Sequence, residues 1–239
     1  MKLAFSSNAY MHFSIEETIA RIGDCGYSGL EILADVPHAW PAGLLEERKD
    51  SIRESLAQYK LTISNINAFM MNAVADPRQP YWHPGWTDPD PHYRAIRREH
   101  TKRCLQLAAD LGARNITTEP GGLLAQEQSW QQGADIFYEE LMPCIELAEQ
   151  LQVDLLIEPE PELLIETFGQ YLEFVDRIDS KRVDNFFTHE VREDHGFRMQ
   201  DSGCRLPEHS SRILHPVSRV LYHESIAVCF SWPSRPSGL

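Results

Sequence analysis

Two strand-like segments in this chain of 239 residues are followed directly by glutamates, and carboxylates can bind cations or move protons. Residues 154–160 read Asp-Leu-Leu-Ile-Glu-Pro-Glu, so Glu158 closes a run that is typical of a buried strand. A carboxylate there could bind a divalent cation or take a proton from a carbon beside a carbonyl. Alternatively, Glu158 caps the strand or pairs with an arginine, and the residues alone leave both interpretations open.

The segment 115–122 ends its predicted strand similarly, with Glu119 after Asn-Ile-Thr-Thr and then Pro120, Gly121 and Gly122. A glycine pair permits the backbone to approach a ligand closely. An ordinary glycine turn explains the same two residues. We predict that Glu119 lines a pocket at this end of its strand.

Aromatic and polar residues are concentrated between Met70 and Pro91, a stretch too long for an ordinary connection in a compact domain. Its segment PYWHPGWTDPDPHY contains His83 and Trp86, which could stack on or hydrogen-bond to a polyol. Packing of the loop itself would use the same side chains. His100 falls within a helical pattern further on, where a satisfied or solvated histidine is the favoured interpretation.

Strand-like and helix-like segments alternate five times, which predicts a parallel sheet with right-handed crossovers and places the strand ends at one edge. We expect strands at residues 2–6, 29–33, 61–69, 115–118 and 153–157. We expect helices at residues 44–59, 93–111, 134–151 and 165–178, after a first helix that Ser14 caps and that Gly23 and Gly26 end. The predicted fold class is α/β.

The composition excludes several functions. Acidic residues outnumber basic ones by 36 to 22, a net charge of −14, which argues against a protein that binds nucleic acid through phosphates. No run of 18 apolar residues and no secretory leader is present, so we expect a cytoplasmic protein without a membrane partner. The odd count of five cysteines predicts free thiols, with Cys25, Cys104 and Cys144 in the core. Dinucleotide, Walker and nucleophile-elbow motifs are absent from the sequence.

Several segments together resemble sugar-phosphate isomerases and epimerases of the xylose-isomerase-like TIM barrel superfamily. The resemblance spans residues 2–182 and rests on LAFSSNAY, SIEETIARIGDCGYSGLEIL, YWHPGWTDPDPHYR, HTKRCLQLAADLGARNITTEPGG and LLIEPEPELLIET. It implies a (β/α)8 barrel with one divalent metal ion, Mn²⁺, Mg²⁺, Co²⁺ or Zn²⁺. Glu158 matches the glutamate of the fifth strand, which in such enzymes is a metal ligand and an acid–base group. His83 resembles a histidine of the sugar pocket, and Glu166 matches a carboxylate on the substrate side.

The family takes its other metal ligands from the last three strands. Asp184 and His189 have suitable chemistry, although their spacing differs from the family pattern and its glycine is missing. The resemblance therefore implies a metal set of Glu158, Asp184 and His189.

The chain changes character after Arg182. Residues 1–182 contain 29 acidic and 16 basic residues, whereas residues 183–239 contain 7 and 6, together with five of the ten histidines. Helical periodicity also stops there. We interpret residues 1–182 as the first five units of the barrel and residues 183–239 as an atypical segment, a degenerate or frameshifted remainder of the same domain. The last three units are therefore expected to be atypical and the barrel incomplete.

The predicted function is that of a metal-dependent sugar or sugar-phosphate isomerase or epimerase, an activity of carbohydrate metabolism. Proton abstraction next to a carbonyl would give an ene-diolate, with Glu158 as base and His83, Trp86, Glu119 and Glu166 around the substrate. The expected partner is a small sugar or sugar phosphate. The sequence leaves open whether the protein also forms a homo-oligomer. The alternatives are a non-catalytic truncated barrel and an endonuclease-IV-like phosphodiesterase, which the acidic charge disfavours.

Overall fold

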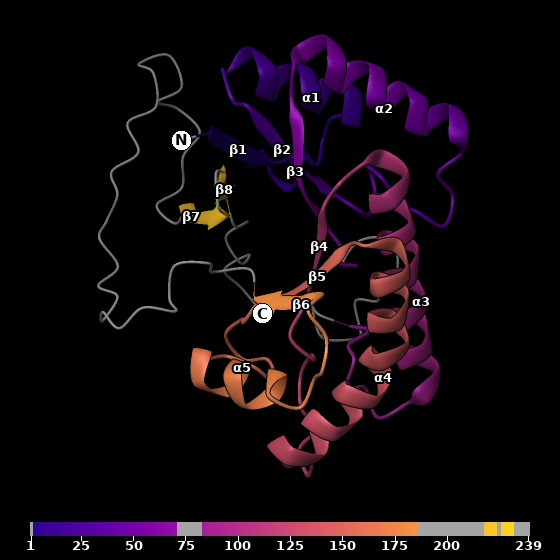
Figure 1. Cartoon of the computed structure of the whole chain (residues 1–239), viewed down its shortest axis with the longest axis vertical. Coiled ribbons are helices and arrows are strands. Elements are labelled where there is room, and N and C mark those ends of the chain that lie inside the picture. The colour runs from indigo at the N-terminus through magenta and orange to yellow at the C-terminus, as the bar shows by residue number, and fades with distance from the viewer. Residues whose placement is uncertain (1, 71–82, 186–217, 224–225, 232–239) are drawn as a thin grey trace.

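The computed structural model describes residues 2–70, 83–185, 218–223 and 226–231 of the chain (Figure 1). The strands are β1 (Lys2–Ser6), β2 (Gly29–Leu33), β3 (Thr62–Asn67), β4 (Asn115–Thr118), β5 (Asp154–Ile157), β6 (Val183–Asn185), β7 (Ser218–His223) and β8 (Ile226–Ser231). The helices are α1 (Ile15–Asp24), α2 (Glu46–Tyr59), α3 (Pro91–Leu111), α4 (Trp130–Leu151) and α5 (Phe168–Val175), with a short 3-10 helix η1 (Ser7–Tyr10) after the first strand.

All eight strands belong to one sheet, in the order β6-β5-β4-β3-β2-β1-β8-β7. The strands β1 to β6 pair in parallel with their neighbours, which confirms the α/β class and the five β–α units. The strand β8 also lies parallel to β1, as the first and last strands of a (β/α)8 barrel do. The strand β7 runs antiparallel to β8, and among the described residues no pairing joins β7 to β6. The last units are therefore atypical, as predicted.

The first helix begins where the capping pattern of Ser14 predicts. The hydroxyl of Ser14 accepts a hydrogen bond from the backbone N–H of Glu17 at 3.2 Å, and the Glu17 carboxylate accepts one from the N–H of Ser14 at 3.0 Å. This capping box fixes the start of α1 and turns the apolar face of the helix onto the sheet. Gly23 lies inside the helix, where a Cβ atom would come within 2.8 Å of Tyr59, and Gly26 follows with a φ of +85°.

The fourth and fifth helices differ from their predicted bounds. The helix α4 begins four residues before the expected residue 134, because Ser129 and Gln132 form a capping box. The helix α5 begins at Phe168 instead of residue 165, because Thr167 and Gln170 form another. Apolar periodicity does not mark a capping residue, so the predicted starts were wrong by three or four residues.

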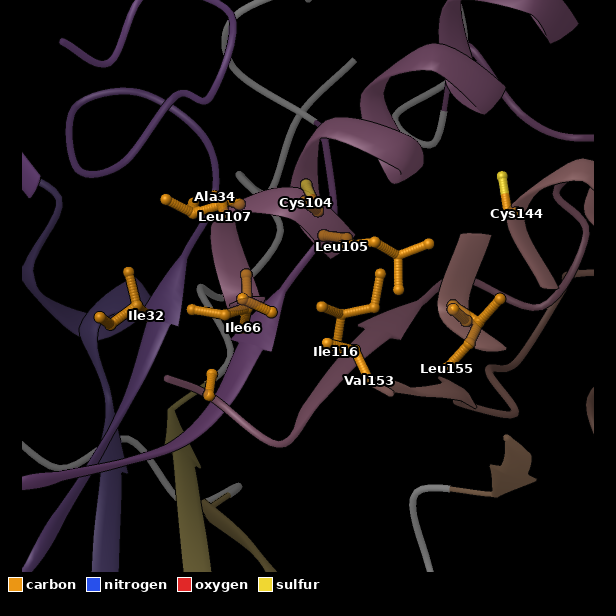
Figure 2. Packing of buried hydrophobic residues seen from close by; sticks show 14 of the residues in the cluster. Ile32, Ala34, Ile66, Cys104, Leu105, Leu107, Ile116, Cys144, Val153 and Leu155 are labelled. Atoms are coloured by element: carbon orange, nitrogen blue, oxygen red, sulfur yellow. The ribbon is translucent and has the colours of Figure 1, made fainter. Parts of the chain in front are cut away.

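Aliphatic side chains from the sheet and the helices form the core between them (Figure 2). Ile32, Ile66 and Leu155 are fully buried, and each comes from a different strand. Cys104 and Cys144 are buried free thiols, as predicted. Cys25 is exposed, which contradicts its predicted place in the core: it is the residue that caps the end of α1.

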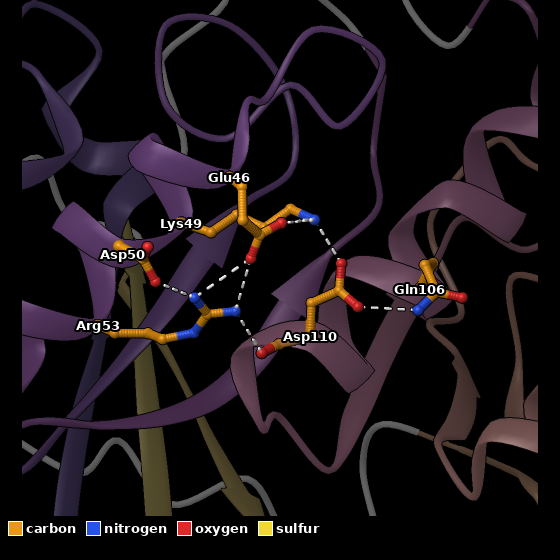
Figure 3. A network of polar contacts seen from close by, with 6 residues as sticks. All are labelled: Glu46, Lys49, Asp50, Arg53, Gln106 and Asp110. Atoms are coloured by element: carbon orange, nitrogen blue, oxygen red, sulfur yellow. Dashed lines mark hydrogen bonds and ion pairs between the residues drawn. The ribbon is translucent and has the colours of Figure 1, made fainter.

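A polar network joins the outer surfaces of two neighbouring helices (Figure 3). Lys49 and Arg53 of α2 reach Asp110 of α3, with Lys49 Nζ 2.5 Å from Asp110 Oδ2 and Arg53 Nη2 2.9 Å from the Asp110 carbonyl oxygen. These contacts hold α2 beside α3, on the helical layer that covers the sheet. Among the described residues, no helix is both long enough and apolar enough to cross a membrane.

Candidate functional site at the carboxyl ends of the strands

The register of the sheet brings polar residues of successive strands to the same edge. Ser6 at the end of β1 lies opposite Glu31 of β2, and Glu31 lies opposite Asn65 of β3. Further along the sheet, the last residues of β4 and β5, Thr118 and Ile157, are also paired. The residues that follow these strands therefore surround one end of the sheet, where enzymes of barrel folds carry their reacting groups.

A chain of hydrogen bonds connects four strands near this end. Ser6 Oγ donates to Glu31 Oε1 at 2.7 Å, and Asn65 Nδ2 donates to Glu31 Oε2 at 2.8 Å. Asn65 Oδ1 accepts in turn from Asn115 Nδ2 at 2.6 Å. Burial raises the pKa of Glu31 to about 7, against the hydrogen bonds from Ser6, Asn65 and Asn67, which lower it. This interior is thus polar and holds a carboxyl group that titrates near neutrality.

Glu119 follows β4 and is fully buried. Its Oε2 lies 2.9 Å from Nη1 of Arg97, an equally buried residue of α3. Burial raises the pKa of Glu119 to about 7, although the charge of Arg97 opposes that rise. Both carboxylate oxygens of Glu119 and Nη2 of Arg97 have no hydrogen-bond partner in the part of the chain that the structure describes, so the Arg97 contact is an ion pair rather than a hydrogen bond. Buried polar atoms normally have a partner, so these three atoms could bond to a ligand or to ordered water.

Glu158 directly follows β5, as the sequence predicts, and only 7% of its surface is exposed. Its backbone N–H donates to the carbonyl oxygen of Thr118 at 3.2 Å, which fixes it beside the end of β4. Glu158 therefore follows β5 at the same edge of the sheet at which Glu119 follows β4. Its proposed role as base and metal ligand remains a prediction.

His83 lies in the segment that leads into α3. Its Nδ1 is 2.9 Å from Asp88 Oδ2, and its ring meets the Tyr93 ring edge to face at 4.2 Å between centroids. The aspartate fixes the orientation of the imidazole and presents Nε2 as the other polar atom of the ring. The predicted neighbours Tyr81 and Trp82 lie outside the described residues.

Trp86 is fully buried, and its indole N–H donates to Thr118 Oγ1 at 3.0 Å. The indole ring packs against Phe137 of α4, with ring centroids 5.6 Å apart. In this arrangement Trp86 anchors the loop on the end of β4. Any contribution to substrate binding would pass through Thr118 and the loop backbone.

The glycine pair after β4 makes close contact with protein. Gly121 and Gly122 have φ of +99° and +98°, and a Cβ on Gly122 would lie 3.1 Å from Gly85 Cα. Thr87 adds two bonds to the Gly121 carbonyl oxygen, from its N–H at 2.8 Å and its hydroxyl at 3.0 Å. The turn interpretation therefore accounts for both glycines, and the turn holds the segment around Trp86.

The remaining predicted site residues are Glu166, on the substrate side, and the metal ligands Asp184 and His189. Glu166 is exposed in the loop before α5, where its Oε1 accepts a hydrogen bond from the Glu162 N–H at 2.6 Å. Asp184 lies in β6 opposite Leu156 of β5; the structure describes its backbone but not its side chain. His189 lies outside the described residues.

A divalent metal would need several of these donors together. The described residues contain no group of three histidine, cysteine or acidic side chains that could hold a metal ion. Glu158 is the single member of the predicted set whose side chain is described. The carboxylate and imidazole chemistry of Glu158, Asp184 and His189 fits Mn²⁺, Mg²⁺, Co²⁺ or Zn²⁺, but the described residues alone do not form a complete site.

Sequence reasoning missed Arg97 and treated His100 as a satisfied or solvated residue. His100 is buried, stacks on Trp40 at 5.0 Å between ring centroids, and contacts Cys104 Sγ at 3.4 Å. Burial, and then the Arg97 charge, lower the pKa of His100 to about 3, so this ring stays neutral. The signal for Arg97 was available: it precedes His100, Cys104 and Ala108 at helical spacing and therefore falls on the buried face of α3.

Comparisons with known proteins agree on the fold. A family model described as xylose isomerase-like TIM barrel matches residues 19–186. A structure described as a D-tagatose 3-epimerase-like protein superposes with a TM-score of 0.64 and 20% identity, over 77% of this chain and 64% of its own. The structure of the IOLI protein with a binding zinc atom superposes with a TM-score of 0.61 and 17% identity, over 78% of this chain and 62% of its own. The structure of a 3-keto-D-glucoside 4-epimerase, YcjR, from E. coli superposes with a TM-score of 0.61 and 16% identity, over 82% of this chain and 72% of its own.

The chain thus spans less than two thirds of the length of the first two of these structures. At such identities the likeness establishes the fold, and the predicted TIM-barrel type is confirmed. No curated protein sequence matches the chain.

Proposed function

Because the chain belongs to the xylose isomerase-like TIM barrel family, we propose that it is a metal-dependent sugar or sugar-phosphate isomerase or epimerase. The observation that carries the proposal is the position of Glu158, whose backbone is held at the end of β5 beside the end of β4 and whose side chain is buried. The epimerases among the similar structures support a small sugar as substrate. The resemblance in sequence, which includes the segment around Glu158, points to the same chemistry.

In the proposed reaction Glu158 removes a proton from the carbon beside the carbonyl of the substrate. For isomerisation it would return a proton to the neighbouring carbon, and for epimerisation a second acid–base group would protonate the same carbon from the other face. Glu158, Asp184 and His189 would hold the divalent ion, which when bound would polarise the carbonyl oxygen. The pairing of β5 with β6 supports this set, because Leu156 lies opposite Asp184 and the two carboxylates come from adjacent strands. The zinc atom in the IOLI structure supports a divalent ion in a fold of this type.

Four residues would orient the substrate. His83, fixed by Asp88, would hydrogen-bond a hydroxyl group through its second nitrogen. Glu119 would accept a hydrogen bond from a hydroxyl group at one of its two carboxylate oxygens, neither of which has a hydrogen-bond partner among the described residues. Glu166 would reach the substrate from the loop after β5, and Trp86 would hold the loop against Thr118.

The experiment that tests the proposal measures metal binding and sugar conversion with the full chain. Mn²⁺, Co²⁺, Zn²⁺ and Mg²⁺ are titrated by calorimetry into the unaltered protein, Glu158→Gln and Glu173→Gln. Glu173 is an exposed residue of α5 and serves as the matched control. We expect Glu158→Gln to weaken metal binding by about tenfold or more and to abolish epimerisation of small ketoses, while Glu173→Gln changes neither.

Metal binding that is the same in the unaltered protein and in Glu158→Gln would refute the assignment of Glu158. A protein that binds metal through Glu158 but converts no sugar or sugar phosphate would support the alternative of a non-catalytic barrel. That alternative is favoured by the sheet, whose described strands leave β6 and β7 unjoined.

A further inference from the structure

Arg97 makes three contacts with groups that are far apart in the sequence. Its Nε donates to the carbonyl oxygen of Pro84 at 2.8 Å, and its Nη1 donates to that of Ala68 at 3.2 Å. The same Nη1 lies 2.9 Å from Glu119 Oε2. The guanidinium is completely buried, so none of these contacts is weakened by bulk water.

The three contacts join the parts that form the candidate site. Ala68 is the first residue after β3, and Glu119 is the first after β4. Pro84 follows His83 directly, in the segment that Trp86 and Thr87 fasten to the end of β4 from the other side. Arg97 therefore contacts the ends of β3 and β4 and the segment that carries His83.

The geometry requires an arginine. A planar guanidinium offers five N–H donors in a fixed fork, so one side chain can donate to the carbonyl oxygens of Pro84 and Ala68 while its charge pairs with Glu119. A lysine could pair with Glu119 but could not hold the two carbonyl oxygens in the same arrangement. Burial of the pair is costly, since an apolar pair of similar volume often stabilises a core as well or better. Stability alone is therefore a poor explanation for this charge.

We propose that Arg97 is a positioning residue, whose guanidinium fixes the segment carrying His83 against the carboxyl ends of β3 and β4. Its consequence for catalysis rests on the proposed sugar chemistry, whereas its effect on the His83 segment does not. In the absence of the fork, the segment leaves the strand ends more often, and His83 is presented to a substrate for a smaller fraction of the time. Glu119 also loses the cation that orients its carboxylate.

The first test measures amide hydrogen exchange in the full chain for the unaltered protein, Arg97→Lys and Arg103→Lys. Arg103 is an exposed residue of the same helix and is the matched control. We expect Arg97→Lys to speed exchange in residues 83–88 by about tenfold or more, including the Thr87 N–H that bonds to Gly121. The rate of amide exchange in α4 is expected to be unchanged. Arg103→Lys should change the rate neither in residues 83–88 nor in α4.

Equal acceleration in residues 83–88 and in α4 would mean that Arg97 stabilises the domain as a whole, which overturns the proposal. Unchanged exchange in residues 83–88 would overturn it as well. If Arg97→Lys does not fold, Arg97→Met removes the buried charge and is compared in the same way, with the same local acceleration expected.

The second test is kinetic and uses a sugar that the unaltered protein converts. Arg97→Lys is expected to raise KM by about fivefold or more with a smaller change in kcat. It is expected to leave the metal titration unchanged, because the contacts described for Arg97 are with Pro84, Ala68 and Glu119, none of which is in the predicted metal set. An unchanged KM together with faster local exchange would overturn the catalytic consequence. If the unaltered protein converts no sugar, the proposed function fails, while the exchange measurement still decides whether Arg97 positions the segment.

Discussion

The carboxyl group of Glu31 connects the polar interior to the pH dependence of stability. Its pKa is about 7 in the folded protein, where burial raises it, and near 4.5 when the chain is unfolded. Between these values the folded state binds the proton more tightly than the unfolded state does. The stability that the protonated Glu31 contributes is therefore fully present below about pH 4.5 and is lost as the pH rises through about 7.

Glu31→Gln should remove this dependence, because the amide carries no charge and Ser6 Oγ can accept as well as donate. Relative to the unaltered protein, the free energy of unfolding of the variant is expected to rise by about 2–3 kcal/mol between pH 5 and pH 8. Urea unfolding at four pH values measures the difference. The exposed Glu173→Gln should show no such trend, and a difference that stays constant with pH for Glu31→Gln would show that Glu31 does not titrate in this range.

At the same scale, the sequence predicted the places of Glu119 and Glu158 because each directly follows a segment with the pattern of a strand. Arg97 could not be assigned in that way. A charged residue in a helix is usually solvated, and the acceptors that make its burial tolerable lie 13 to 29 residues away. Partners at that distance are known only once the strands are placed.

At the scale of the elements, a comparison of the turns after α1 and β4 distinguishes the effect of backbone strain from that of steric contact. Gly26 and Gly122 both have positive φ, at +85° and +98°. No atom lies within 4 Å of a Cβ on Gly26, whereas a Cβ on Gly122 would lie 3.1 Å from Gly85 Cα. Gly26→Ala should therefore lower the free energy of unfolding by about 1–2 kcal/mol, from strain alone.

Gly122→Ala should lower the free energy of unfolding by about 1–3 kcal/mol more than Gly26→Ala does, because the turn must also move away from the segment that contains Gly85. Urea unfolding of both variants gives the comparison. Equal costs would mean that the contact between Gly122 and Gly85 yields without penalty. The sequence predicted this turn but could not choose between packing and ligand approach, since the choice depends on which backbone lies opposite.

For the whole molecule, the question is whether residues 183–239 are part of the barrel. Their composition differs from that of residues 1–182, and their helical periodicity is lost. Nevertheless β6 pairs with β5 through three residues, and β8 lies beside β1, with Lys2 opposite Ile226 and Phe5 opposite Cys229. Both strands come from the atypical segment. We therefore expect it to complete the domain begun by the first five units.

A chain that ends at Arg182 tests this expectation, because it leaves β1 and β5 with unpaired edges that can associate with other chains. We expect this chain to aggregate or to unfold without a sharp transition, as measured by size-exclusion chromatography and a thermal melt. In the full chain, Ala227→Pro is expected to act in the same direction, since residue 227 pairs with Leu3 on one side and Tyr222 on the other, and a proline there has no N–H to donate to a neighbouring strand. A chain of residues 1–182 that elutes as a monomer and melts as sharply as the full protein would show that the atypical segment is dispensable for the fold.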